Sequence, residues 1–128
     1  SDHCIAVFAY FLFCLITKQF VNDLQVGKPI TTIDVRTPNE SAVLSITLPG
    51  CLSIPVNELF LKDNLERIPT DRTVVIICKN GTRATAVGTA LRHIGFDNVY
   101  ILKGGIMALS DYLNPKTANP SKEKTAMR

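Results

Sequence analysis

The segment Cys78–Arg83 has the residue types and spacing best suited to chemistry, and it directly follows the apolar run Val74–Ile77. A helical pattern begins immediately after it, so the free N–H groups of that helix should point back into the loop. Helix N-termini and neighbouring cations, here Lys79 and Arg83, favour the thiolate form of cysteine, which is the nucleophile. The segment therefore predicts an anion-holding loop with Cys78 as its nucleophile. The alternative is that Cys78 is a small buried residue at a strand end.

The elements that must position this loop alternate between strand-like and helix-like segments, the pattern of an α/β domain with a parallel sheet. The run Val74–Ile77 is apolar throughout, as a strand covered on both faces requires. We therefore expect an open, mostly parallel central sheet flanked by helices on both faces. The predicted strands are Ile30–Val35, Val74–Ile77 and Val99–Leu102; the predicted helices run from a Thr17 cap to Gly27, over Asn57–Ile68, from Ala84 to Gly95, and over Ile106–Leu113.

Length and charge fit one domain without a nucleic-acid surface. The chain has 128 residues, and its 14 basic residues are scattered and leave a net charge of only +3. We divide it into an apolar N-terminal segment (1–16), a folded domain (17–113) and a polar tail (114–128) that is expected to be disordered.

The N-terminal segment contains thirteen consecutive apolar residues, Cys4–Ile16. A membrane-spanning helix needs about 20 residues. No positively charged region precedes the run and no small-residue cleavage site follows it, as a secretory signal would require. Two readings stay open: a buried strand or helix that packs on the domain or across a dimer, and the end of a longer membrane segment. Residues 4–16 are thus a candidate contact with a membrane or a second copy.

Four motifs in the same order make the sequence resemble the rhodanese sulfurtransferases. The resemblance extends from about Ile16 to Leu113 and is centred on the Cys78 loop. The motifs are Ile33–Glu40, Leu48–Cys51 with Ser53–Pro55, Cys78–Arg83, and Gly95–Tyr100 with Lys103–Ile106.

The resemblance implies covalent sulfur transfer through Cys78. Cys78 would take a sulfane sulfur from a small anionic donor such as thiosulfate, from polysulfide or from a protein persulfide. It would then pass that sulfur to cyanide, a thiol or a protein acceptor. The resulting persulfide anion would be stabilised by the backbone N–H groups of the loop residues Lys79, Asn80, Gly81, Thr82 and Arg83.

Two other residues fall at the same end of the sheet, Asp34 and Arg36, because both follow a predicted strand. In the functional reading Arg36 lines the pocket and Asp34 supports the loop or Arg83. In the structural reading Asp34 satisfies loop amides and Arg36 pairs with Glu40. We favour the structural roles.

The cysteine pattern suggests no metal or cofactor, because no two of the four cysteines have the CxxC spacing of a zinc site. Cys51 is most simply a core residue, although a place near Cys78 would let it resolve the persulfide as a disulfide.

A working thiol at Cys78 suits a reducing, cytoplasmic location. Membrane association through the N-terminal segment stays open.

Two other functions remain open. Related phosphatases and arsenate reductases carry five residues between the cysteine and the arginine, whereas four separate Cys78 from Arg83, so the ring fits a single sulfur better than a phosphate. The domain could also be a partner-binding or membrane-tethered regulatory module that kept the fold without turnover. The intact loop favours the enzyme.

Overall fold

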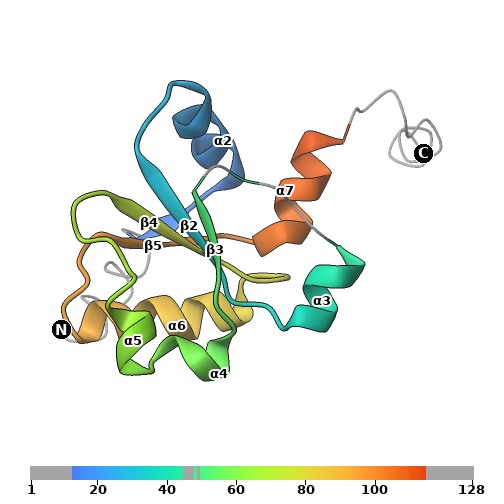
Figure 1. Ribbon diagram of the computed structural model, residues 1–128. Coiled ribbons are helices and arrows are strands. Elements are labelled where there is room, and N and C mark those ends of the chain that lie inside the picture. The colour runs from blue at the N-terminus through green and yellow to red at the C-terminus, as the bar shows by residue number, and fades with distance from the viewer. Residues whose placement is uncertain (1–12, 45–47, 49, 115–128) are drawn as a thin grey trace, which may run out of the picture.

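The computed structural model describes residues 13–44, 48 and 50–114, which build a five-stranded sheet with helices on both faces (Figure 1). The predicted fold class is confirmed. The strands are β1 (Cys14–Leu15), β2 (Ile30–Asp34), β3 (Cys51–Ser53), β4 (Thr73–Ile77) and β5 (Val99–Leu102). The helices are α2 (Thr17–Gln25), α3 (Pro38–Val43), α4 (Val56–Leu59), α5 (Lys62–Leu65), α6 (Thr82–His93) and α7 (Gly105–Leu113).

The strand order is β1-β5-β4-β2-β3, and every neighbouring pair is parallel. From β2 the chain passes through α3 to β3, at one edge of the sheet. From β4 it passes through α6 to β5, toward the opposite edge. The strand order therefore reverses between β2 and β4, and ligands of open parallel sheets bind at the carboxyl ends of the strands at such a point.

The central strand β4 alternates between two apolar cores. Val74 and Ile76 pack with residues of α4 and α6, whereas Val75 and Ile77 pack with residues of α2 and α7. All four side chains are buried, which explains why the sequence shows an unbroken apolar run rather than polar alternation. The sheet is therefore a rigid base for the loop that follows β4.

Two predicted helices differ from the structure. The single helix expected over 57–68 is two short helices, because the chain extends at Leu61 and the Asn64 amide donates to the Glu58 carbonyl in place of a helical N–H. The break lets Leu59 and Ile68 both reach the core. Thr17 is the first residue of α2 and does not cap it; Ile16 holds the cap position without a side-chain hydrogen bond.

The end of the predicted apolar segment joins the sheet as an edge strand. Cys14 and Leu15 pair with β5, and the buried Phe13 ring lies 4.7 Å from the Arg92 guanidinium. Residues 4–12 and the tail from 115 onward lie outside the described residues, so the predictions made for them stay predictions. Within the described part of the chain, no helix is long and apolar enough to cross a membrane.

Candidate functional site

Cys78 lies at the carboxyl end of β4, where its side chain is buried at the end of the core that β4 forms with α4 and α6. Its Sγ accepts hydrogen bonds from the backbone N–H of Gly81 at 3.0 Å and of Ala84 at 3.3 Å. The first turn of α6 therefore points at the sulfur, and the positive end of a helix dipole favours a negatively charged atom there. The arrangement suits a thiolate nucleophile.

The loop keeps this shape through a tight turn at Gly81. The φ angle of Gly81 is +96°, and a Cβ at that position would lie 3.1 Å from the backbone nitrogen of Gly104. The Asn80 side chain accepts from the Thr82 N–H at 3.1 Å, and the Thr85 hydroxyl donates to the Gly81 carbonyl at 2.7 Å. Asn80 and Thr82 thus shape the loop while their side chains remain exposed.

The start of α7 holds the other side of the loop. The backbone N–H groups of Ile106 and Met107 donate to the carbonyls of Cys78 and Lys79 at 2.9 and 3.0 Å. Gly105, with φ of +61°, approaches so closely that a Cβ would overlap the Cys78 carbonyl oxygen and lie 2.7 Å from that of Lys79. Sequence reasoning quoted the Gly-Gly pair as a motif but assigned it no contact with the nucleophile.

Asp34 and Arg36 pair with each other. The favoured pairing of Arg36 with Glu40 is therefore wrong, and so is the alternative of a hydrogen bond between Asp34 and Arg83. The Asp34 carboxylate does accept the backbone N–H of Arg36 at 3.0 Å, in line with the favoured role of satisfying backbone amides. Residues two apart on extended backbone face the same side, which brings the Arg36 fork to the neighbouring carboxylate. Arg36 Nε lies 3.0 Å from Asp34 Oδ1, and Nη2 lies 2.8 Å from Oδ2. Arg36 is only 3% exposed, and its remaining nitrogen donates to the Leu44 carbonyl.

Arg83 instead forms a two-pronged ion pair with Glu40 of α3. Both Nη–Oε distances are 2.6 Å, and Glu40 also accepts from the Thr37 N–H at the start of its own helix. Hydrogen bonds from Arg83 first, and then from Thr37, lower the pKa of Glu40 from 4.5 to about 2. The same pair raises the pKa of Arg83. The ion pair ties α3 to the nucleophile loop across 43 residues of sequence.

This ion pair predicts a specific pH dependence for Glu40→Gln. Because the folded pKa of Glu40 lies below its unfolded value, its contribution to stability is full above about pH 4.5 and is lost as the pH falls toward about 2. Urea unfolding should therefore show a difference in stability between wild type and variant that is constant from about pH 5 to 8 and shrinks below that range. A difference that stays constant down to about pH 3 would contradict the pairing.

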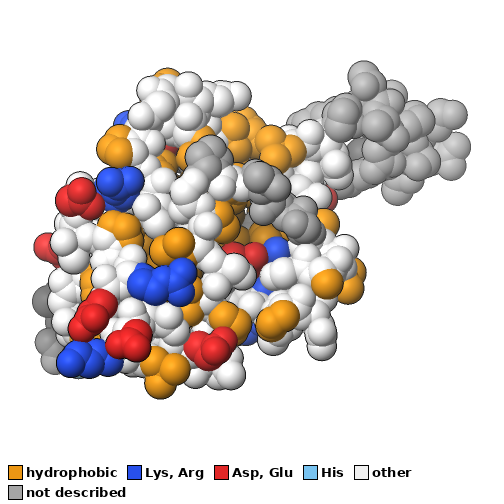
Figure 2. Space-filling model, viewed as in Figure 1, with side chains coloured by type: hydrophobic (Ala, Val, Ile, Leu, Met, Phe, Trp, Pro, Cys, Tyr) orange, Lys and Arg blue, Asp and Glu red, His pale blue; other side chains and the backbone are white. Residues whose placement is uncertain are grey.

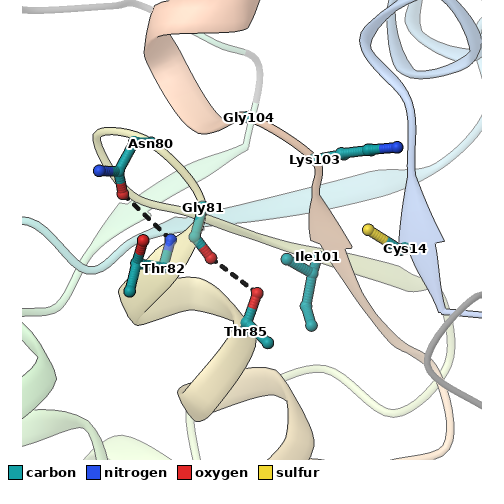
Figure 3. A pocket seen from close by; sticks show the side chains of 8 residues that line it. All are labelled: Cys14, Asn80, Gly81, Thr82, Thr85, Ile101, Lys103 and Gly104. Atoms are coloured by element: carbon teal, nitrogen blue, oxygen red, sulfur yellow. Dashed lines mark hydrogen bonds between the residues drawn. The ribbon is translucent and has the colours of Figure 1, made fainter. Parts of the chain in front are cut away.

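Two pockets flank the loop. One, of about 330 Å³, lies between α3 and the loop and is lined by Arg36, Asn39, Glu40, Val43, Leu44 and Lys79. The other, of about 240 Å³, lies on the β1 side and is lined by Cys14, Asn80, Gly81, Thr82, Thr85, Ile101, Lys103 and Gly104 (Figure 3). The loop thus separates a pocket next to α3 from a pocket next to β1.

Cys51 does not lie near Cys78. It begins β3 and is in register with Thr32 of β2, which is itself in register with Val75, three residues before Cys78. The two intervening strand spacings amount to about 10 Å. A disulfide needs its Cα atoms within about 7 Å, so the alternative in which Cys51 resolves the Cys78 persulfide is wrong. Cys51 is half-buried and belongs to neither apolar core of the described residues, so the favoured prediction of a core residue is not confirmed either. In the described part of the chain, no three His, Cys, Asp or Glu residues are grouped to hold a metal.

Comparison with known proteins agrees with this geometry. The model of the rhodanese-like domain matches residues 17–111. A relative from Mycobacterium tuberculosis, "Probable adenylyltransferase/sulfurtransferase MoeZ", is 34% identical over 101 residues, which are 78% of this chain but 25% of the relative. "Sulfurtransferase" of Allochromatium vinosum is 35% identical over 79 residues, 62% of this chain and 70% of that protein.

A solved structure shows the same arrangement of elements. The rhodanese-like domain protein from Staphylococcus aureus is 29% identical and superimposes with a TM-score of 0.64, covering 75% of this chain and 89% of that one. The present chain spans about a quarter of the length of the Mycobacterium tuberculosis relative. The chain belongs to the rhodanese-like domain family.

Proposed function

We propose that this protein is a sulfurtransferase that carries a sulfane sulfur as a persulfide on Cys78. The observation that carries the proposal is the pair of backbone N–H groups, from Gly81 and Ala84, directed at the Cys78 Sγ. Donors fixed in this way stabilise negative charge on the sulfur without having to reorganise during the reaction. The sulfurtransferase names of the relatives agree with it.

In the first step the Cys78 thiolate attacks the outer sulfur of a donor such as thiosulfate. A new sulfur–sulfur bond forms to Cys78, the bond between the two donor sulfurs breaks, and sulfite leaves with its two negative charges. The product is the persulfide anion. The exposed ammonium of Lys79, next to the nucleophile, attracts the anionic donor.

In the second step the outer sulfur leaves for an acceptor. With a thiol, the acceptor sulfur bonds to the outer sulfur, the bond to Cys78 breaks, and the thiol proton passes to the transferred sulfur. With cyanide, the cyanide carbon forms the new bond and thiocyanate leaves. Cys78 returns to a thiolate held by the same two N–H groups, so the loop serves both half-reactions.

The test is thiocyanate formation from thiosulfate and cyanide, with initial rates measured over both concentrations. A covalent intermediate predicts parallel lines in double-reciprocal plots, the signature of a ping-pong reaction. Intersecting lines would exclude a free persulfide enzyme. Absence of turnover with thiosulfate and with polysulfide, with the thiol shown to be reduced, would contradict the proposal and favour a binding module without turnover.

A further inference from the structure

We infer that the pocket between α3 and Lys79 binds the sulfur acceptor, and that it selects a small thiol carrying an apolar chain and a carboxylate. The inference rests on the proposed function and names the acceptor class for the same Cys78. It follows from the apolar residues that line the pocket, from the charges of its lining, and from its border with the nucleophile loop at Lys79.

The apolar wall comes from α3, a helix that contributes no buried residue to the core. Val43 is 89% exposed and Leu44 is 40% exposed, and both line the pocket. Hydrophobic side chains gather over α3 in the space-filling view (Figure 2). The volume, about 330 Å³, lies at the small end of ligand pockets and suits a small molecule. A bound methylene chain would cover these side chains.

The charges of the pocket leave one cation unpaired. Asp34 compensates Arg36, and Arg83 compensates Glu40. Lys79 is exposed and has no ion-pair partner among the described residues. A ligand with a single carboxylate therefore complements the pocket, whereas a cationic ligand would meet Lys79 without a free carboxylate to offset it.

The pocket also borders the nucleophile loop, because the loop residue Lys79 lines it. Lys79 directly follows Cys78, and Glu40 contacts the nucleophile loop through Arg83. Thiosulfate and cyanide have no apolar part that could use Val43 or Leu44. The apolar wall therefore distinguishes the acceptor from these small anions.

The experiment compares three thiols as acceptors of sulfur from thiosulfate, with sulfite release as the common readout: mercaptopropionate, mercaptohexanoate and mercaptohexanol. We expect kcat/KM about fivefold to tenfold higher for mercaptohexanoate than for mercaptopropionate, since half-burying each of its additional methylenes corresponds to about twofold. We expect kcat/KM to be about twofold to fivefold higher for mercaptohexanoate than for mercaptohexanol, the size of effect that an exposed ion pair gives.

Two variants assign these preferences to residues. Val43→Ser should reduce the chain-length ratio to about twofold or less, and Lys79→Met should remove the preference for the carboxylate. Val26→Ser is the matched control, because Val26 is 64% exposed at the end of α2 and lines none of these pockets. The control should keep both ratios.

The outcomes separate this inference from the proposed function. Equal kcat/KM for the two mercapto acids, or a ratio unchanged in Val43→Ser, would overturn the acceptor pocket while turnover with cyanide upholds sulfur transfer. Failure with cyanide as well as with all three thiols would overturn the proposed function itself, and the acceptor pocket with it.

Discussion

Cys78→Ser should abolish thiocyanate formation from thiosulfate and cyanide, lowering kcat by about a thousandfold or more. Serine fits the same space at the end of β4, so the fold should remain. A hydroxyl is not ionised at neutral pH, and the two N–H groups directed at the Cys78 sulfur would then have no anion to stabilise. The loss should appear in kcat rather than in KM alone, because the nucleophile is missing.

Cys51→Ser is the matched control for this experiment. Cys51 is half-buried at the start of β3, away from the loop, and its thiol donates a long hydrogen bond, 3.9 Å, to the Leu52 carbonyl. The control should keep wild-type turnover. Sustained thiocyanate formation by Cys78→Ser, or its loss in Cys51→Ser with the fold intact, would place the chemistry on another residue.

Gly105→Ala should lower both stability and turnover, because Gly105 sits against the nucleophile loop. A left-handed residue with a Cβ costs about 1 to 2 kcal/mol, and this Cβ would in addition overlap backbone atoms of Cys78 and Lys79, which cannot rotate away. We expect a loss of more than about 3 kcal/mol in the free energy of unfolding, measured with urea. The displaced loop should also reduce kcat.

Gly27→Ala separates backbone strain from overlap. Gly27 has a φ of +79°, but a Cβ there would meet nothing within 4 Å. The free energy of unfolding of Gly27→Ala should therefore fall only by the cost of the left-handed conformation, about 1 to 2 kcal/mol, and its turnover should be unchanged. Equal effects of the two substitutions on stability and turnover would contradict the proposed contact between Gly105 and the loop.

The features that follow from local patterns could be predicted from the sequence. The apolar run before Cys78 predicted a strand covered on both faces, and β4 is that strand. The helical spacing after the loop and the stop at Gly95 predicted α6. Strand ends meet at one edge of a parallel sheet, so the loop and the Asp34–Arg36 segment were expected together, and β2 is indeed the neighbour of β4.

The side-chain pairings could not be predicted, because they depend on which groups face one another in space. Asp34 and Glu40 both lie close to Arg36 in the sequence, so either carboxylate could have paired with it. Arg36 pairs with Asp34 because the extended backbone directs both side chains to the same side. Glu40 pairs instead with Arg83, which lies 43 residues away in the sequence. The contact of Gly105 with the loop depends in the same way on how α7 packs.

The most direct test is the mass of the intact protein after incubation with thiosulfate, measured under non-reducing conditions and followed by peptide mapping. A persulfide carrier should gain the mass of one sulfur atom, about 32 Da, on the peptide containing Cys78, and should lose it when cyanide is added. No added sulfur, or sulfur found on Cys14 or Cys51 instead, would contradict the assignment of Cys78 as the carrier.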